Sequence, residues 1–142
     1  MDADGAIFEE IVLDRAVHSV TDVQVACGCR AEQVLKTLVL AGSRRALVVL
    51  PGDRRLDLRA LTVWLGDAPL RFATRSEVLA MTGQEVGTLS PFGGFDGLRR
   101  LADVRICDLD VVIAGSGEQG VLLRLAGAEF GRRFRGEFLD LA

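Results

Sequence analysis

The sequence predicts a single domain, residues 1–142, of the α/β (α+β) class, in which a mixed, mostly antiparallel sheet is flanked by helices. A chain of 142 residues can bury a core, and its 49% hydrophobic and 26% charged residues are typical of globular proteins. Short apolar runs alternate with helical stretches and glycine-rich turns. Several runs are joined by turns too short for parallel crossovers, which favours one mixed sheet over a doubly wound one.

The chain is expected to begin with one ambiguous segment and one helix. Residues 6–14, AIFEEIVLD, fit either a strand or a short helix. Residues 19–29 are predicted to be helical, because Ser19 or Thr21 can cap the start and Gly28 can end the helix.

A β-hairpin is predicted next. Residues 31–35 form a short helical turn, and the apolar runs TLVLA and ALVVL then flank GSRR, a pattern typical of two antiparallel strands. Lys36 therefore lies at or just before the start of the first strand. The sequence PGDRR, residues 51–55, is predicted to form a turn after the second strand.

The remainder is predicted to alternate helices with short strands. In a helix at 56–66, ended by Gly66, the side chains expected to face inward are Leu58, Leu61, Trp64 and Leu65. A strand at 69–73 and a helix at 74–83 follow, and Thr74 or Ser76 can cap this helix while Gly83 ends it. The later elements are a glycine-rich loop at 84–97, one or two strands within 103–115, a strand at 120–126, and a closing helix or irregular tail at 126–142.

Charge and composition exclude some classes of function. The formal charge is −3, and the chain has one Trp and no Tyr, which argues against a protein with a broad basic, base-stacking surface. No apolar run reaches the length of a membrane helix, and the acidic N-terminus lacks the features of a signal peptide. We therefore expect a cytoplasmic protein, with no membrane contact, whose three cysteines are reduced. A local patch of the four turn arginines, Arg44, Arg45, Arg54 and Arg55, remains compatible with this charge.

The cysteines and the single histidine do not form a recognisable motif. Cys27, Cys29, Cys107 and His18 could in principle supply four zinc ligands, or a Cys–His nucleophile pair. Small, half-buried thiols and a loop histidine are the favoured interpretation, so neither a metal nor any other cofactor is predicted. The sequence also contains no P-loop, no nucleotide-binding glycine fingerprint and no G-x-S-x-G.

Lys36 is the only lysine in a chain that otherwise uses Arg for every basic side chain. It lies within an apolar run, where one interpretation is a packed stem with a solvated amine. A compact ammonium can, however, fit beside a carbonyl or phosphate where a planar guanidinium cannot, and its pKa falls readily on burial. A functional role for Lys36 is therefore favoured.

The second candidate feature is the sequence GTLSPFGG, residues 87–94. Glycines near a proline make a stiff, open loop whose main-chain N–H groups can face a ligand oxygen. An ordinary turn-rich connection is the alternative interpretation of this loop.

Taken together, these segments resemble the YbaK/prolyl-tRNA-synthetase-associated family of editing domains. The matching stretches are HSVTDVQVACGCRAEQVLKTLVL, ALVVLPGDRRLDLRAL, EVLAMTGQEVGTLSPFG and VVIAGSGEQGVLLRL, which span roughly residues 18 to 125. The most specific part is the order and spacing of K-T-L, P-G-D and the T-G…G-x-x-x-P-F-G stretch.

The resemblance implies an aminoacyl-tRNA deacylase that hydrolyses the ester of a mischarged tRNA carrying a small amino acid such as Ala or Cys, with tRNA for proline as a candidate acceptor. It implies Lys36 as the catalytic residue, and a substrate pocket formed by Gly87, Thr88, Leu89, Ser90 and Pro91 with the glycine turn Gly115, Ser116 and Gly117. Thr88 stands where the family often has glycine, which bears on pocket size or loop flexibility. The implied partners are the acceptor end of the tRNA and an aminoacyl-tRNA synthetase.

Two other functions fit the residues. One is a binding module of the same fold that holds an amino acid, a nucleotide or a tRNA end without hydrolysis. The other is an unrelated small-molecule hydrolase that uses a cysteine or His18.

Overall fold

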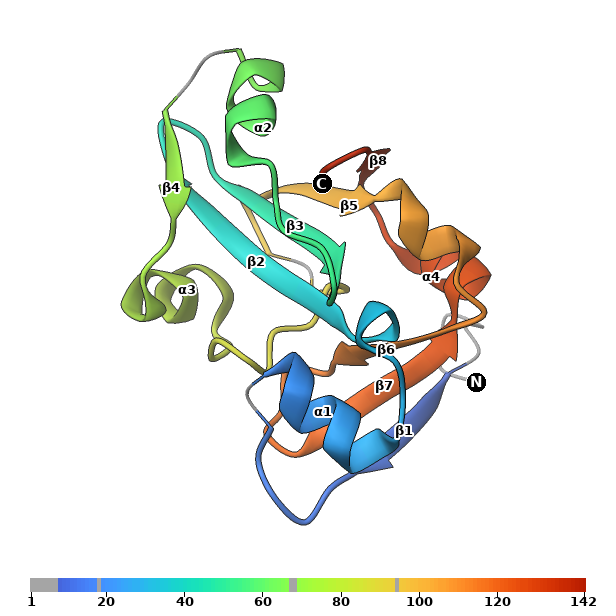
Figure 1. Cartoon of the computed structure of the whole chain (residues 1–142). Coiled ribbons are helices and arrows are strands. Elements are labelled where there is room, and N and C mark those ends of the chain that lie inside the picture. The colour runs from blue at the N-terminus through green and yellow to red at the C-terminus, as the bar shows by residue number, and fades with distance from the viewer. Residues whose placement is uncertain (1–7, 18, 67–68, 94) are drawn as a thin grey trace.

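The computed structural model describes residues 8–17, 19–66, 69–93 and 95–142, and it arranges their strands in two sheets (Figure 1). The larger sheet has the strand order β4-β2-β3-β5-β8, and the smaller has the order β1-β7-β6. Two of the pairings, β3 with β5 and β5 with β8, are parallel, whereas the other four are antiparallel. The predicted class is confirmed, but the strands are divided between two sheets and do not form one.

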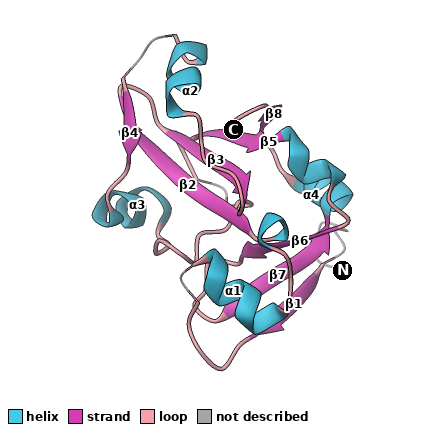
Figure 2. Ribbon diagram, in the orientation of Figure 1, coloured by secondary structure: helices cyan, strands magenta, loops and turns pink. Residues whose placement is uncertain are grey.

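Helices and strands are interspersed along the chain, and Figure 2 shows their arrangement. The strands are β1 (Glu9–Val12), β2 (Leu35–Gly42), β3 (Ala46–Pro51), β4 (Leu70–Phe72), β5 (Arg99–Asp103), β6 (Val111–Gly115), β7 (Val121–Ala126) and β8 (Glu137–Leu139). The α-helices are α1 (Val20–Cys27), α2 (Leu58–Trp64), α3 (Arg75–Thr82) and α4 (Gly127–Arg133), with 3₁₀ turns η1 (Ala31–Gln33) and η2 (Val104–Asp108). None of the described helices is long and apolar enough to cross a bilayer.

The predicted caps fix the ends of the helices. The Ser19 hydroxyl accepts a hydrogen bond from the Asp22 amide at the start of α1, and Gly28 ends that helix in the left-handed conformation. Thr74 and Glu77 form a reciprocal capping box at the start of α3, which Gly83 ends. These local signals therefore set the boundaries of both helices.

The two sheets meet at the start of β2. Val34, just before this strand, forms a parallel bridge to Ile113 of β6. β4 pairs only with residues 40–42, so in the described part of the sheet the first half of β2 pairs on one side only, with β3. This half-open edge lies beside the smaller sheet, near α1 (Figure 1).

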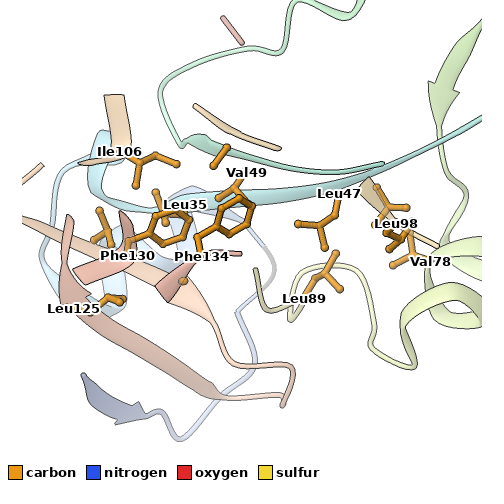
Figure 3. Close-up of a cluster of buried hydrophobic side chains, with 14 residues drawn as sticks. Leu35, Leu47, Val49, Val78, Leu89, Leu98, Ile106, Leu125, Phe130 and Phe134 are labelled. Carbon is orange, nitrogen blue, oxygen red and sulfur yellow. The ribbon is translucent and has the colours of Figure 1, made fainter. Parts of the chain in front are cut away.

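The larger sheet is buried on both faces. β3 has no exposed residue, because its side chains alternate between two apolar clusters. On one face, Leu50 and Leu40 pack with Leu61 of α2. On the other, Leu47 and Val49 pack with Leu89 of the glycine-rich loop and with the stacked rings of Phe130 and Phe134, as Figure 3 shows.

Three details of the sequence prediction are wrong. Residues 99–103 form strand β5 and residues 137–139 form strand β8, although neither was expected as a strand. Within residues 103–115, where one or two strands were expected, one strand forms, β6, and the 3₁₀ turn η2 precedes it. Trp64 was expected to face the core, but it is 43% exposed, and the Arg99 guanidinium carbon lies 4.5 Å from the centre of its ring.

Candidate functional site

A cavity of about 350 Å³ lies where the two sheets meet. It is bounded by α1, the first half of β2, the glycine-rich loop and the smaller sheet. Its wall is mainly branched aliphatic side chains. The lining residues are Val17, Ser19, Val20, Val23, Val34, Leu35, Lys36, Thr37, Leu38, Val86, Gly87, Leu89, Ile113, Ala114, Gly115 and Leu122. Among them, Lys36 carries the only ionisable side chain, so the cavity combines an apolar wall with a single ammonium.

Lys36 is the second residue of β2, where the strand edge faces the cavity. Its Nζ donates a hydrogen bond to the main-chain carbonyl of Arg54. Partial burial lowers the pKa of the Lys36 ammonium, the nearby Arg55 lowers it further, and Asp53 opposes both effects. No carboxylate among the described residues forms an ion pair with Lys36. The ammonium thus keeps donor capacity for a ligand oxygen.

The turn after β3 brings the Arg54 carbonyl to Lys36. This turn packs its main chain against η1, because Gly52 has no side chain. A Cβ at Gly52 would overlap the carbonyl oxygen of Ala31 and would lie 2.6 Å from that of Val34. The close main-chain contact at Gly52 of the P-G-D sequence therefore positions the Arg54 carbonyl, which accepts the hydrogen bond from Lys36.

The glycine-rich loop contributes Val86, Gly87 and Leu89 to the lining of the cavity, and at Gly87 it can present only main chain. Gly87 adopts a positive φ of 92°, which favours glycine, and Gly87 and Leu89 line the cavity. Thr88 and Ser90 are buried: the Thr88 hydroxyl donates to the Glu85 carbonyl, and the Ser90 amide donates to the Gln84 side-chain oxygen. These bonds hold the loop in a fixed shape.

The later glycine turn clamps the same loop. The Gly117 amide donates to the Thr88 carbonyl over 2.7 Å. A Cβ at Gly115 would lie 2.6 Å from the Leu89 carbonyl oxygen and 2.7 Å from that of Thr88. The Ser116 hydroxyl instead closes its own turn by donating to the Val121 carbonyl. Gly115 and Gly117 thus position the loop.

The structure therefore brings only part of the predicted set to the cavity. Lys36, Gly87, Leu89 and Gly115 line it. The other predicted residues do not line the cavity and instead belong to the glycine-rich loop or to the glycine turn that holds it: Thr88, Ser90, Pro91, Ser116 and Gly117. Sequence reasoning missed the apolar wall from α1 and β6, and it missed Gln84. The amide of Gln84 bridges the loop to the glycine turn, a role without a local sequence signal.

The cysteines do not form a site. Cys27 and Cys29 pack beside the cluster near α1, whereas Cys107 lies in η2 beside Gly131 of α4. Burial raises the pKa of all three thiols, which disfavours the nucleophilic thiolate. The described residues contain no group of three or more potential metal ligands. His18 lies outside the described residues.

The four turn arginines do not form one patch. Arg44 and Arg45 lie in the β2–β3 turn, whereas Arg54 and Arg55 follow β3 at the opposite end of the hairpin, beside Lys36. The sequence left open a single patch of these arginines or solvated turn residues, and the length of the strands between the two turns excludes a single patch of all four.

Comparisons with known proteins point to one family. The family model of the aminoacyl-tRNA editing domain matches residues 14–132. A proline–tRNA ligase of Pelobacter propionicus is 30% identical over 128 residues, covering 88% of this chain, and one of Streptococcus gordonii is 32% identical over 111 residues, covering 78%. The chain spans only 22% and 18% of the lengths of these two relatives.

Solved structures show the same fold. A protein described as a candidate trans-editing enzyme for prolyl-tRNA synthetase superposes with a TM-score of 0.83 at 28% identity, over 94% of this chain and 85% of its own. The hypothetical protein APE2540 superposes with a TM-score of 0.89 at 23% identity, over 98% of this chain and 93% of its own. The second likeness establishes the fold alone.

Proposed function

We propose that this chain, which belongs to the family of aminoacyl-tRNA editing domains, is a deacylase that hydrolyses the ester of a small amino acid on a mischarged tRNA at the cavity beside Lys36. One observation carries the assignment of the site. The Lys36 ammonium is the only ionisable group among the described residues that line a mainly apolar cavity, and Gly87 of the glycine-rich loop exposes its main chain to the same cavity. Such a cavity can take an aliphatic side chain while polar groups at its rim hold the ester.

The chemistry needs positioning more than acid–base catalysis. An aminoacyl ester is already activated, so water can attack its carbonyl carbon once the carbonyl oxygen is held and its developing charge is stabilised. In this proposal, the Lys36 ammonium contacts that oxygen or the terminal phosphate. Among the described residues, no acceptor takes the amide protons of Gly87 and Leu89, which suits them to a ligand oxygen.

The proposed reaction balances without a cofactor. The water oxygen bonds to the acyl carbon, and the tetrahedral intermediate then releases the ribose oxygen. That oxygen takes a proton, which leaves a free amino acid and an uncharged tRNA. The cavity lining has no carboxylate or imidazole among the described residues, so the ribose hydroxyl next to the ester is the proposed activator of the water.

The acceptor is proposed from the relatives. The matched ligases act on tRNA for proline, and the structural relative is described as an editing enzyme for prolyl-tRNA synthetase. We therefore propose tRNA for proline, charged with Ala or Cys, as the substrate, with the matching synthetase as a partner. Aliphatic lining favours an uncharged side chain over a charged one.

A panel of charged tRNAs tests this function. We expect the protein to release Ala or Cys from tRNA for proline at least about tenfold faster than it releases proline, and faster than the uncatalysed reaction. Ser-charged tRNA and other acceptors complete the panel. If no member is hydrolysed while an amino acid, a nucleotide or tRNA still binds, the chain is a binding module and not an enzyme. Inhibition by a thiol-alkylating reagent would instead indicate cysteine chemistry.

Gly115→Ala is expected to lower kcat/KM about tenfold or more. The added Cβ cannot be accommodated without moving the main chain of Thr88 and Leu89, so the loop would leave its place at the cavity. Deacylation under single-turnover conditions measures the effect. Gly131→Ala is the matched control, because its Cβ meets only the thiol of Cys107. Equal rates for Gly115→Ala and the wild type would contradict the clamp.

A further inference from the structure

We propose that a second cleft, at the far end of the β2–β3 hairpin, binds a backbone phosphate of the RNA remote from the ester. The choice of RNA as the source of the phosphate rests on the proposed function. The cleft has a volume of about 390 Å³ and is more polar than the cavity beside Lys36. Its lining residues are Gly42, Ser43, Arg44, Arg45, Leu65, Gly97 and Arg99. Three of these are arginines, and none is acidic.

Within the described residues, the positive charge of this cleft is largely uncompensated. Arg44 and Arg45 are exposed, and neither forms an ion pair with any carboxylate of the described residues. Arg99 does have a carboxylate partner, because its Nη2 lies 2.8 Å from Glu137. In a chain with a formal charge of −3, two arginines that share a cleft and have no carboxylate partner among the described residues form a local site for an anion.

The arginines stand on a fixed frame. The Ser43 amide donates to the Pro69 carbonyl over 3.1 Å, and the Arg99 amide donates to the Arg45 carbonyl over 3.2 Å. Gly42 has a φ of 110°, and a Cβ there would overlap the Pro69 carbonyl oxygen, so the turn requires glycine. The Arg99 guanidinium is held against Trp64 and Glu137. A preorganised arrangement lowers the entropic cost of ligand binding.

The cleft is too far from Lys36 to share a phosphate with it. Lys36 pairs with Leu50 at one end of the hairpin, and Leu40 pairs with Ala46 at the other. The six residue-to-residue steps from Lys36 to Gly42 span roughly 20 Å along an extended strand. A phosphate in the cleft therefore belongs to a nucleotide well away from the aminoacylated end. The cleft should recognise the body of the acceptor stem and should be indifferent to the amino acid.

Arg44→Gln/Arg45→Gln tests the proposal. With full-length Ala-charged tRNA for proline, KM is expected to rise about tenfold with kcat unchanged. The slope of log affinity for uncharged tRNA against log salt should become shallower by about 0.9, which corresponds to one lost phosphate contact. The Ala ester of the trinucleotide CCA cannot reach the cleft, so its KM should be unchanged. Arg132→Gln/Arg135→Gln, in and after α4, removes the same charge elsewhere and should change neither quantity.

The outcomes separate this proposal from the function. If the wild type hydrolyses no ester, the proposed function fails, yet the affinity and salt dependence of uncharged tRNA still test the cleft. Unchanged values in a folded Arg44→Gln/Arg45→Gln variant would overturn the proposal, and so would an equal loss in the Arg132→Gln/Arg135→Gln control. A last experiment measures the Tm of the wild type and of the variant with inorganic phosphate. If phosphate raises the Tm of the wild type but not of the variant while tRNA binding is unchanged, the cleft holds a small anion and the RNA assignment is wrong.

Discussion

Deacylation by the Lys36→Ala variant is expected to fall by a factor of about 100 or more, with the fold intact. The change removes the only ionisable side chain among the described residues that line the cavity, and the loss of a single donor to a developing oxyanion typically has an effect of this size. Single-turnover hydrolysis of Ala-charged tRNA for proline measures the rate, and circular dichroism with thermal unfolding checks the fold.

Two further substitutions separate the ammonium from its stem. Lys36→Met keeps the length and packing of the side chain but removes the charge, so it should be as inactive as Lys36→Ala. Lys36→Arg keeps the charge but replaces a compact ammonium with a planar fork, and it should recover little activity. A packed stem alone would leave Lys36→Met active, and that result would remove Lys36 from the mechanism.

Phe130→Ala is expected to lower the free energy of unfolding by about 3–5 kcal/mol, the usual cost of removing a fully buried aromatic ring. Phe130 is 0% exposed. Its ring stacks on Phe134 at 5.3 Å between centroids, and it packs against Phe92 of the glycine-rich loop at 5.4 Å and Phe138 of β8 at 6.3 Å. The same ring thus supports the core and the loop beside the cavity. Urea unfolding measures the loss.

Phe72→Ala is the matched control for that measurement. Phe72 lies in the edge strand β4 and is 52% exposed, so the same chemical change should cost less than about 1 kcal/mol. Comparable losses for the two variants would mean that the aromatic cluster is not the main support of this part of the core.

The elements with local signals could be predicted from the sequence, whereas those set by tertiary pairing could not. Helices α1 and α3 have caps that can be read from a few residues, such as Ser19 and Thr74. Strand β5 begins with two arginines, so its sequence looks polar, and only pairing with β3 and β8 on its two sides makes it a central strand. β8 has only three residues, which is too few for a period to be recognised.

Trp64 shows the same limit at the level of one side chain. Helical spacing places it near Leu61 and Leu65, which are buried, and a sequence reading therefore turns all three inward. The helix ends at Trp64, however, and the ring lies at the surface under the Arg99 guanidinium. Because Arg99 lies 35 residues further along the chain, no local sequence pattern could predict this contact.

The region of the candidate site could be predicted from the sequence, but not which of its residues line the cavity and which support the loop. The unusual lysine and the glycine-rich loop marked the right region. The sequence could not tell that Gly87 and Leu89 face the cavity while Thr88 and Ser90 are turned away, because the direction depends on the clamp from Gly117 and on the amide of Gln84. The aliphatic wall also comes from segments distant in sequence, which meet only when the two sheets pack.

The partner of the Lys36 ammonium is a peptide carbonyl, and this has a consequence for how the protein can vary. Any amino acid at position 54 supplies the same carbonyl oxygen, so substitutions at that position keep the hydrogen bond to the Lys36 ammonium. The vulnerable position is Gly52, because a methyl group there would push the turn away from the Ala31 and Val34 carbonyls. The position of the Lys36 amine thus depends on the main-chain conformation at Gly52, two residues before Arg54, and not on the side chain of residue 54.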